Sequence, residues 1–576
     1  MRKLLRYLRN YKKESIIGPL FKLLEACFEL IVPLVMANII DIGIKNQDMP
    51  YIWKMGAVLV MFGVCGLTCS LTAQYFAAKA AVGFGTELRH DLFSHIGTLS
   101  YTEIDQVGSA TLVTRMTSDI NQVQSGVNLV LRLFLRSPFI VVGAMVMAFT
   151  ISVKVSLIFV VAVPLLALVI YGIMAVTIPL YKKVQRGLDQ ILLSTRENLS
   201  GIRVIRAFCT QTEEVKSFSE ENNHLVNLQM LVGKIAALLN PVTYVLVNVA
   251  TIAIVWFGGK QVYQGSLSQG EVIALVNYMS QILLALVALA NLIVSFTKAI
   301  ASASRINEVF DLRSNIVDGV QEQQNDGQEE AVRFEHVSMS YNGKEEAISD
   351  ISFSVKRGET IGIIGGTGSG KSTLVNLIPR FYDVAKGKIF INGDDVKKYR
   401  LEDLRKKIGV VPQKAVLFQG TIRDNMKIGN ENATDEMIYH ALEIAQAMEV
   451  VEKKGGLDGK ISQNGKNLSG GQRQRLTIAR AIVRAPEILI LDDSASALDF
   501  ATDAKLRKAI AESTDEMTVF IVSQRVSSVM QADQIIVLDD GEMVGIGTHQ
   551  ELLRTCNVYQ EICRLQLVQE EVECHA

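Results

Sequence analysis

The sequence is short of charged residues and of patterned cysteines. Of its 576 residues only 20% are charged, whereas 49% are hydrophobic, and the mean hydropathy is +0.26. Such a composition excludes a disordered chain, a fibrous repeat and an ordinary soluble enzyme. The seven cysteines show neither a disulfide framework nor the paired spacing of a metal site. No small-residue cleavage site follows a short apolar core near the start, which excludes a secretory signal peptide.

The small net charge of −1 conceals an uneven division of charge along the chain. Residues 1–320 carry 27 Lys and Arg against 20 Asp and Glu, whereas the remaining residues carry 31 against 39. A basic, apolar half therefore precedes an acidic, soluble half. At about 100–200 residues per domain, the length predicts three or four domains.

Long uncharged stretches in the first half predict membrane-spanning helices. Four of them contain 24, 27, 25 and 26 residues, more than the roughly 20 that a helix needs to cross the hydrocarbon layer. They lie between Lys54 and Lys79, Lys154 and Lys182, Lys234 and Lys260, and Glu271 and Lys298. Residues 16–40 and 137–153 are two further candidates, which brings the expected number of spans to six.

The distribution of Lys and Arg predicts the orientation of these spans. Residues 1–15, 83–128 and 181–234 together carry sixteen, whereas the short loops on the other side carry four. Because cytoplasmic loops are enriched in Lys and Arg, both ends of the chain and both long connections are expected in the cytoplasm. The protein is then integral to the cytoplasmic membrane.

Helical spacing of apolar residues continues outside the spans. Residues 1–15 predict a basic amphipathic helix on the inner membrane surface, with apolar side chains at Leu4, Leu5, Leu8 and Tyr11. The two long connections keep similar spacing, so we expect helices that extend below the membrane rather than flexible loops.

Charged side chains in the first and third spans have two interpretations. Glu25 and Glu29 lie one helical turn apart, as do Arg132 and Arg136. The carboxylates could face a translocation cavity and attract cationic substrates, because charge inside a membrane is a functional hypothesis by default. Alternatively they pair with the arginines or lie in solvent near the inner mouth, and we favour this second interpretation.

After the last span the composition changes to that of a soluble domain. Residues 16–317 are therefore assigned to the transmembrane domain, residues 318–330 to a polar linker and residues 331–576 to the soluble domain. Strand-like runs follow the linker, and one of them, residues 360–364, leads directly into the sequence GGTGSGKST.

This sequence, residues 365–373, fits the pattern G-x-x-x-x-G-K-[ST] of a phosphate-binding loop. Its glycines allow backbone N–H groups to approach the β- and γ-phosphates, Lys371 supplies a cation, and Ser372 can reach Mg²⁺. The helix that follows directs its positive end at the anion. The loop consists of Gly365, Gly366, Thr367, Gly368, Ser369, Gly370, Lys371, Ser372 and Thr373.

Two further motifs lie later in the soluble domain. Asp492 ends a strand-like run, residues 488–491, at the position where P-loop proteins hold their metal with an acidic group. The sequence LSGGQ, residues 468–472, ends 20 residues before Asp492 at the start of a helix, and it makes a second anion site.

The order of these motifs resembles that of the ATP-binding cassette (ABC) transporters of the exporter type, in a single half-transporter chain. The resemblance covers essentially the whole chain. It implies a six-helix transmembrane domain (all-α) followed by an α/β P-loop nucleotide-binding domain of the ABC type. It also implies that two such domains close head to tail, with each ATP between the phosphate loop of one chain and the LSGGQ signature of the other. Coupling helices near residues 101–110 and 208–218 are implied to dock on the nucleotide-binding domains.

The resemblance implies roles for individual residues. Tyr341 matches the aromatic residue that stacks on adenine, and Asp499 lies in the D-loop, residues 496–499. Gln413 matches the Q-loop glutamine, which is implied to hold Mg²⁺ together with Ser372 and Asp492. The signature is implied to contact nucleotide through Ser469, Gly470, Gly471 and Gln472.

Two positions depart from the family pattern. Asp493 replaces the usual glutamate that activates the attacking water, and Gln524 replaces the usual switch histidine. Aspartate is one methylene shorter, and an amide cannot carry the positive charge of histidine. With the phosphate loop and signature intact, this pair predicts a site that binds ATP and hydrolyses it poorly. In this respect the chain resembles the degenerate-site subunit of bacterial heterodimeric multidrug exporters.

The expected protein is one subunit of an ATP-driven exporter that moves amphiphilic small molecules, drug-like compounds or lipids, out of the cytoplasm by alternating access. Its cofactors are ATP and Mg²⁺, and its partners are the lipid membrane, the substrate and a second half-transporter chain, with no nucleic acid. A heterodimer is favoured over a homodimer, because the intact signature would complete a competent site on the partner. Two alternatives stay open: an ATP-binding regulatory or scaffold subunit without turnover of its own, and an importer built on the exporter fold.

Overall fold

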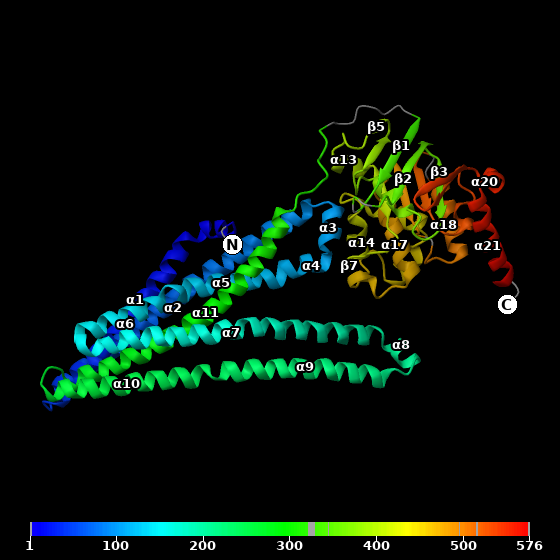
Figure 1. Cartoon of the computed structure of the whole chain (residues 1–576). Coiled ribbons are helices and arrows are strands. Elements are labelled where there is room, and N and C mark those ends of the chain that lie inside the picture. Colours follow the sequence, from blue (N-terminus) through cyan, green and yellow to red (C-terminus); the bar gives the residue numbers. More distant parts are fainter. Residues whose placement is uncertain are drawn as a thin grey trace. The chain divides into compact units, whose positions relative to one another are not determined.

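The computed structural model describes residues 3–320, 329–341, 343, 345–494, 496–513 and 516–573. The chain forms two compact units (Figure 1), not the three or four domains that its length predicts. The helical unit comprises Met1–Gly97 and Gly108–Leu312, and the α/β unit comprises Thr98–Val107 and Arg313–Ala576. The length-based prediction was wrong because one bundle of long helices takes up about half of the chain.

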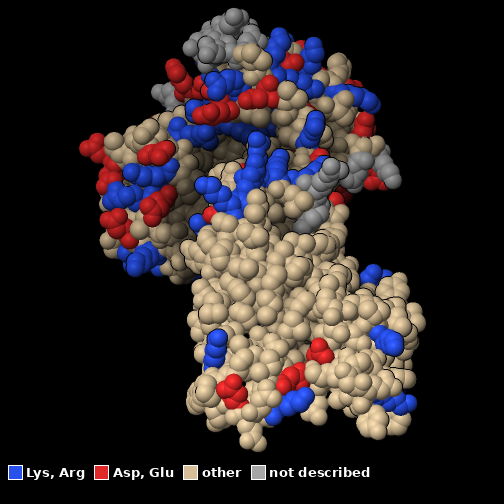
Figure 2. All heavy atoms as spheres, turned by 90° about the vertical axis from the view of Figure 1, so that its left-hand side faces the viewer, with Lys and Arg blue, Asp and Glu red and all other residues tan. Residues whose placement is uncertain are grey.

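Six helical stretches among the described residues are long and apolar enough to cross a membrane, which confirms the expected number of spans. Figure 2 shows that, on the face in view, charged side chains are sparse over these helices and numerous over the α/β unit. The stretches are Leu4–Ile44, Met49–Thr98, Ser109–Ile151, Val153–Ser200, Gln211–Tyr263 and Gln269–Asp311.

The long connections between spans are helical, as expected. α7 and α9 run side by side well beyond the apolar spans (Figure 1). The α-helices of this unit are α1 (Lys12–Asn38), α2 (Met49–Thr98), α4 (Ser109–Thr114), α5 (Ile120–Leu129), α6 (Arg136–Ile151), α7 (Val153–Ser200), α8 (Ile202–Ala207), α9 (Gln211–Ala237), α10 (Leu239–Tyr263) and α11 (Gln269–Asp311). Its π-helical segments are η2 (Ile39–Ile44), η3 (Arg115–Asp119) and η4 (Val130–Phe134).

α11 supplies much of the buried surface of the helical unit. Tyr278 and Met279 are fully buried, and the Tyr278 hydroxyl donates a hydrogen bond to the Leu30 carbonyl oxygen of α1 (2.7 Å). A Cβ on Gly126 of α5 would lie 2.3 Å from the Ala299 Cβ of α11. Small residues therefore let α5 and α11 approach closely, as is common between membrane helices.

The N-terminal segment, expected to form an amphipathic helix over residues 1–15, is helical: a 3₁₀-helix, η1 (Leu4–Tyr11), leads directly into α1 at Lys12. Leu4 and Tyr7 are buried, whereas Leu5 is exposed. The buried positions thus differ in part from the expected apolar set of Leu4, Leu5, Leu8 and Tyr11, and the location of this segment on the inner membrane surface stays a prediction. Residues 1–2 lie outside the described residues.

The two expected coupling helices had different outcomes. α3 (Tyr101–Val107) is a short helix at the first position, and it belongs to the α/β unit. The second position, residues 208–218, was wrong, because it contains a turn and the start of α9. The short helix of this connection is α8, which lies just before that position. Gly201 separates α8 from α7, and α8 ends before a left-handed residue, Cys209 (φ +56°).

The described residues of the α/β unit form three sheets. A six-stranded sheet has the order β12–β11–β3–β10–β9–β6, an antiparallel four-stranded sheet has the order β2–β1–β4–β5, and β7 pairs with β8. The strands are β1 (Glu330–Met339), β2 (Ile348–Lys356), β3 (Thr360–Gly365), β4 (Lys386–Ile391), β5 (Asp394–Asp395), β6 (Ile408–Val411), β7 (Gly420–Thr421), β8 (Lys460–Ile461), β9 (Ile488–Asp492), β10 (Thr518–Val522), β11 (Gln534–Asp539) and β12 (Glu542–Gly547).

The register of the parallel strands positions the predicted site. Asp492 at the end of β9 pairs with Val522 at the end of β10, which pairs with Ile363 of β3. β3 ends two residues later at Gly365, so the phosphate loop and Asp492 leave the sheet at the same edge. Ligands of open α/β sheets bind at the carboxyl ends of the strands.

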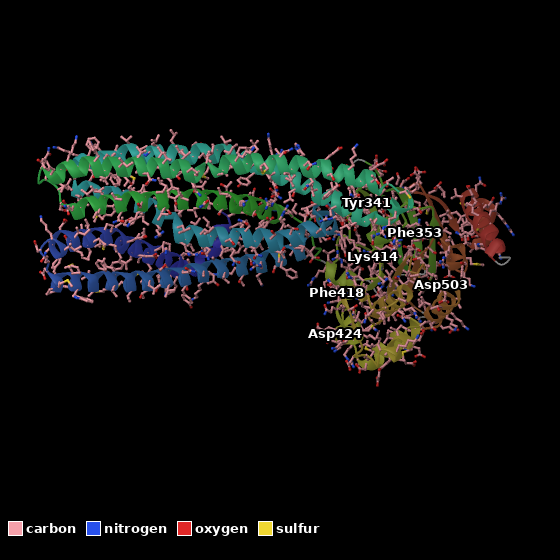
Figure 3. All side chains as sticks on the ribbon, turned by 90° about the horizontal axis from the view of Figure 1, so that it is seen from below. Tyr341, Phe353, Lys414, Phe418, Asp424 and Asp503 are labelled. Atoms are coloured by element: carbon pink, nitrogen blue, oxygen red, sulfur yellow. The ribbon has the colours of Figure 1, made fainter. Side chains whose placement is uncertain are left out.

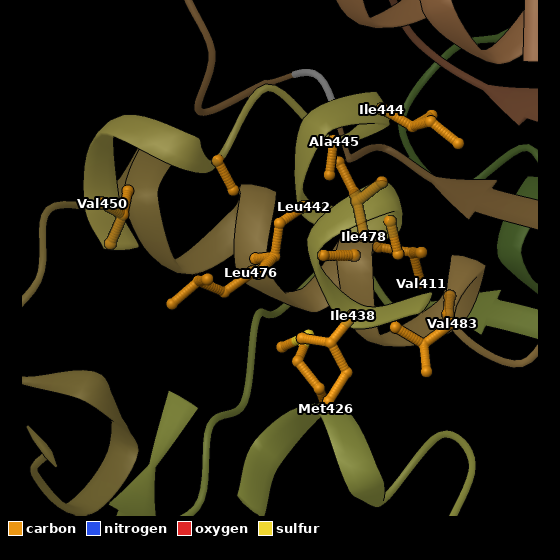
Figure 4. Packing of buried hydrophobic residues seen from close by; sticks show 14 of the residues in the cluster. Val411, Met426, Ile438, Leu442, Ile444, Ala445, Val450, Leu476, Ile478 and Val483 are labelled. Atoms are coloured by element: carbon orange, nitrogen blue, oxygen red, sulfur yellow. The ribbon is translucent and has the colours of Figure 1, made fainter. Parts of the chain in front are cut away.

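Helices cover the six-stranded sheet and bury an apolar core. Ile438 and Leu442 of α15 belong to one buried cluster with Leu476 and Ile478 of α17 (Figure 4). The helices are α12 (Lys371–Leu377), α13 (Leu401–Lys406), α14 (Ile422–Lys427), α15 (Asp435–Ile444), α16 (Met448–Lys453), η5 (Gln463–Gly465), α17 (Gly470–Ile482), α18 (Phe500–Ser513), α19 (Val526–Val529), α20 (His549–Thr555) and α21 (Asn557–Glu573).

Of the predicted linker, residues 318–330, residues 321–328 lie outside the described residues. Before them, Asp318 accepts a hydrogen bond from the Leu401 backbone N–H (2.7 Å). The start of the predicted linker therefore packs on the α/β unit, and its last residue, Glu330, begins β1.

Candidate functional site

A cavity of about 340 Å³ lies at the carboxyl edge of the six-stranded sheet. The loop after β3, the start of α12 and the ends of β9 and β10 border it. The structure therefore brings most of the predicted site residues together within the α/β unit. The lining residues are Tyr341, Ala347, Thr367, Gly368, Gly370, Lys371, Ser372, Thr373, Gln413, Asp492, Asp493, Val522, Ser523 and Gln524.

The phosphate loop requires glycine at two of its positions. Gly368 and Gly370 have φ values of +85° and +91°, in the left-handed region that other residues rarely adopt. A Cβ on Gly370 would also lie 2.7 Å from Ile348 Cγ2, so there is no room for a side chain. Beside Gly368 the described residues leave open space, which allows the backbone to approach a phosphate closely.

Lys371 is held by the phosphate loop itself. Its Nζ donates hydrogen bonds to the carbonyl oxygens of Gly365 (3.0 Å) and Gly366 and to Ser369 Oγ (3.3 Å). Burial lowers the pKa of Lys371, and nearby aspartates oppose this shift. The loop carbonyls thus hold an ammonium group for which a triphosphate would be the stronger, charged partner.

Oxygen ligands suited to Mg²⁺ meet beside Lys371. Ser372 Oγ donates a hydrogen bond to Asp492 Oδ1 (3.0 Å), and Gln413 lines the same cavity. Burial raises the pKa of Asp492, an effect that the Ser372 hydrogen bond reduces. Among the described residues no group of three or more His, Cys, Asp and Glu could hold a metal ion by itself. The Ser372 and Asp492 oxygens, with Gln413 beside them, fit Mg²⁺ that also takes phosphate and water oxygens as ligands.

Asp493 and Gln524, at the two catalytic positions, line the same cavity. Asp493 has a φ of +44°, and its Oδ2 accepts a hydrogen bond from Gln413 Nε2 (3.2 Å). Aspartate enters the left-handed region more readily than most residues. The carboxylate that would act as a general base is thus already bound by the Q-loop glutamine.

A residue that the sequence did not indicate holds the segment after β10. Gln566 of α21 donates from Nε2 to the Gln524 carbonyl oxygen (2.6 Å) and accepts at Oε1 from the Val526 N–H (2.8 Å). One amide therefore fixes the backbone on both sides of Arg525, directly after the switch position. No sequence motif surrounds Gln566, so no signal could have found it.

The signature residues are absent from the lining of this cavity, as far as the described residues define it. Ser469 is the N-cap of α17: its Oγ accepts from the Gln472 N–H (3.3 Å), and Gln472 Oε1 accepts from the Ser469 N–H (3.0 Å). This reciprocal pair fixes the start of the helix, while Ser469 and Gly470 are exposed. The exposed helix start can receive an anion from a second molecule.

Asp499 is also absent from the lining and caps α18. Its carboxylate accepts hydrogen bonds from the Thr502 backbone N–H and hydroxyl, both at 2.9 Å, and these lower the pKa of Asp499. Tyr341, labelled in Figure 3, does line the cavity, unlike Asp499, and its hydroxyl is 3.1 Å from Thr373 Oγ1. The nucleotide contacts expected of both residues stay predictions.

The charged residues of the first span are paired. Glu29 Oε2 accepts a hydrogen bond from Arg136 Nη2 (2.7 Å), which confirms the favoured interpretation for this carboxylate. Glu25 instead pairs with Lys22 (2.6 Å), one turn earlier on the same helix, and not with Arg132. Together with Phe28 and Phe62, both carboxylates nevertheless line a cavity of about 320 Å³ between α1 and α2.

Comparison with known proteins agrees with the fold and the site. The family described as ABC transporter transmembrane region matches residues 15–286, and the family described as ABC transporter matches residues 348–496. The chain is 38% identical over 576 residues to the uncharacterized ABC transporter ATP-binding protein YfiB of Bacillus subtilis (strain 168), covering all of both chains.

Two further similarities extend over most of the chain. The ATP-dependent lipid A-core flippase of Desulfotalea psychrophila (strain LSv54 / DSM 12343) is 32% identical over 481 residues, which are 83% of this chain and 84% of the flippase. The structure of a bacterial Atm1-family ABC exporter with ATP bound superposes with a TM-score of 0.78 over 96% of this chain and 98% of the exporter. Because the sequences of this chain and that exporter are only 22% identical, the superposition shows the fold alone.

The fold class expected from the sequence is confirmed: six apolar helices precede an α/β nucleotide-binding domain. The protein is integral to a membrane and acts as a dimer, and its ATP-binding domain hydrolyses ATP to drive transport. The chain belongs to the ABC transporter family, as a half-transporter of the exporter type.

Proposed function

We propose that this chain is the degenerate-site subunit of a heterodimeric exporter, and that its own phosphate loop binds ATP with Mg²⁺ but hydrolyses it slowly. The observation that carries the proposal is the arrangement of Asp493. A general base must come within hydrogen-bond reach, about 2.6–3.2 Å between heavy atoms, of the group whose proton it removes. The Asp493 side chain is one methylene shorter than glutamate, and Gln413 already occupies its Oδ2 at 3.2 Å.

The chain's own residues suit binding better than hydrolysis. Lys371, Ser372 and Asp492 would hold the triphosphate and its metal, Gln413 would complete the set, and Tyr341 would take the adenine. Mg²⁺, when bound, neutralises charge that develops on the phosphates during transfer. Gln524 can donate a hydrogen bond there, but it adds no positive charge.

The signature supports a role in the partner's site. Ser469 and Gln472 cap α17 reciprocally, and the helix start is exposed. In a homodimer this intact signature would serve only the weak site of an identical chain. In a heterodimer it completes a competent site, which is why we favour the heterodimer.

The cargo that we propose is an amphiphilic small molecule, a drug-like compound or a lipid, exported by alternating access. Apolar spans and the similarity to a lipid A-core flippase support this class. ATP binding supplies the difference in affinity that favours the closed state, and hydrolysis with product release resets it. The excess of Lys and Arg in the N-terminal segment and the long connections supports cytoplasmic termini and a location in the plasma membrane.

The test begins with the partner. This chain is tagged, purified gently from its native membrane, and the protein recovered in equal amount is identified. We expect a second cassette chain with Glu and His at the positions equivalent to Asp493 and Gln524. Recovery of this chain alone, as a dimer, would contradict the heterodimer.

Variants of the purified complex then assign turnover to one of the two sites. Gly470→Asp places a negative charge at the signature, where a Cβ has ordinary clearance (3.9 Å to the Ala497 Cβ). It should abolish most ATP hydrolysis, whereas Lys371→Ala should leave most of it. The opposite pattern would show that this chain's own loop is the productive one. If neither variant of this chain impairs transport, a scaffold role replaces the exporter subunit.

A further inference from the structure

We infer that Tyr382 links the adenine base to α3, so that the position of α3 responds to the base and not to the phosphates alone. The inference rests on the proposed function, because it takes Tyr341 as the platform for the base. Tyr382 is a positioning residue, since it touches Tyr341 and α3 and does not line the nucleotide cavity among the described residues.

A continuous set of aromatic contacts connects the two places. The rings of Tyr341 and Tyr382 meet edge to face, with centroids 5.1 Å apart and an interplanar angle of 86°. Tyr382 lies 6.1 Å from the Tyr101 ring of α3, and Tyr101 lies 4.7 Å from the Phe381 ring. The Tyr382 hydroxyl also donates a hydrogen bond to Asp105 Oδ2 of α3 (2.7 Å). All of these residues belong to the α/β unit, so the contacts lie within one compact body.

The segment that carries Tyr382 is anchored. Arg405 donates to the carbonyl oxygens of Pro379 (3.2 Å) and Arg380 (3.1 Å). Arg380 is buried and pairs with Asp383 through its Nε (2.7 Å). Because Tyr382 contacts both the half-exposed Tyr341 ring and α3, we expect a shift of the Tyr341 ring to reach α3 through Tyr382.

A buried carboxylate ties α3 to the residue before it and to the segment after α11. Glu103 is buried, its Oε2 accepts from the Ser100 N–H (2.9 Å), and its Oε1 accepts from the Asn315 N–H (3.4 Å). Burial and then Asp105 raise the pKa of Tyr382, so its hydroxyl stays protonated and keeps donating.

The consequence is reciprocal. If base binding changes the position of α3, any event that moves α3 changes the affinity for the base by the same factor. A triphosphate without a base would fill the phosphate loop and leave Tyr341 free. Comparing ATP with a triphosphate that lacks a base therefore distinguishes an effect on α3 that begins at the base from one that begins at the phosphates.

The experiment measures hydrogen exchange of α3 in the full complex in lipid nanodiscs, with MgATP or with magnesium tripolyphosphate at saturation. We expect MgATP to slow exchange of residues 101–107 about fivefold more than tripolyphosphate does, the effect of one hydrogen bond. Tyr382→Phe keeps the ring and loses the hydroxyl, and should reduce this difference severalfold. Tyr382→Leu, which removes the ring as well, should abolish it, whereas Asp105→Asn added to Tyr382→Phe should change it no further, because the hydroxyl that bonds Asp105 is already absent. Tyr439→Phe, at an exposed position of α15, is the matched control and should leave the difference intact.

Two results overturn the inference and are distinguishable. If tripolyphosphate protects α3 as strongly as MgATP does, the route begins at the phosphates, while the proposed function stands. If equilibrium dialysis shows that MgATP does not bind this chain, the proposed function fails and the inference with it. A merely structural role for Tyr382 would change protection equally with both ligands, which also contradicts the inference.

Discussion

Replacing Asp493 by glutamate should convert this chain's nucleotide site from slow to fast hydrolysis. Asp493→Glu extends the carboxylate by roughly 1.5 Å, the length of one C–C bond. We expect the longer side chain to move its carboxylate away from Gln413, which now donates a hydrogen bond to Asp493 Oδ2 at 3.2 Å. Both changes favour a carboxylate that can meet the attacking water.

The expected size of the effect follows from these two changes. Positioned general bases contribute about 10²–10⁴-fold to rate, of which a short, displaced carboxylate retains part. Releasing a charged acceptor from a hydrogen bond costs about 1.5 kcal/mol, equivalent to roughly tenfold in rate. We therefore expect turnover at this site to rise about 10–100-fold. Adding Gln524→His should raise it further, because an imidazolium supplies positive charge near the γ-phosphate.

The assay is ATP turnover of the reconstituted complex after the partner's phosphate-loop lysine has been changed to alanine. Asp540→Glu is the matched control, because Asp540 is another aspartate of this unit with a left-handed backbone (φ +43°), in a turn away from the cavity lining. Unchanged turnover in both Asp493→Glu and the double variant would refute the reasoning, since the original pair would then be adequate.

Four other predictions follow from single contacts. Gly370→Ala should abolish ATP binding, because a left-handed φ costs a non-glycine residue about 1–2 kcal/mol and the added Cβ would lie 2.7 Å from Ile348 Cγ2. An unchanged affinity for ATP in equilibrium dialysis contradicts this prediction. Gln566→Ala should speed hydrogen exchange of residues 524–526 about fivefold or more, through loss of hydrogen bonds worth about 1 kcal/mol each, and unchanged exchange counts against it. Mg²⁺-dependent ATP binding should weaken as the pH falls, with a midpoint above 3.8, the ordinary pKa of aspartate. Burial raises the pKa of Asp492, and a protonated carboxyl cannot ligate the metal. Asp492→Asn should lack this pH dependence, and a midpoint at or below 3.8 contradicts the prediction. Glu29→Gln should lower the thermal stability of the helical unit by about 1–3 kcal/mol by leaving Arg136 unpaired, and Arg136→Gln in that background should recover part of the loss.

Features with a local cause were predictable from the sequence. Long uncharged runs indicate spans wherever they fall, and the phosphate loop is found because its glycines and Lys371 serve one ligand. The strand before it and Asp492 follow from the same pattern. The site residues that line one cavity were therefore found without knowledge of the fold.

Features that depend on distant partners were not predictable. Gln566 reaches the switch segment from another helix, and Glu29 bonds Arg136 from a helix more than 100 residues further along the chain. The pairing of Glu25 with Lys22, by contrast, is local to one helix, and the expected arginine partner was wrong because Lys22 lies only one turn away. The 3₁₀ form of the N-terminal helix was not predictable, because a short segment with Leu4, Leu5 and Leu8 satisfies a period of 3.6 as readily as one of 3.0.

The membership of α3 in the α/β unit bears on how such chains can be recombined. The chain leaves the helical unit after Gly97, contributes α3 to the α/β unit, and returns at Gly108. The sequence boundary near residue 317 is therefore not where the folded modules divide. A chimaera that exchanges only the C-terminal domain would pair a foreign Tyr382 with the resident Asp105. Transplanting residues 98–107 together with that domain preserves the native contact between Tyr382 and Asp105. For the same reason, residues 98–107 belong with the C-terminal domain when either part is expressed alone.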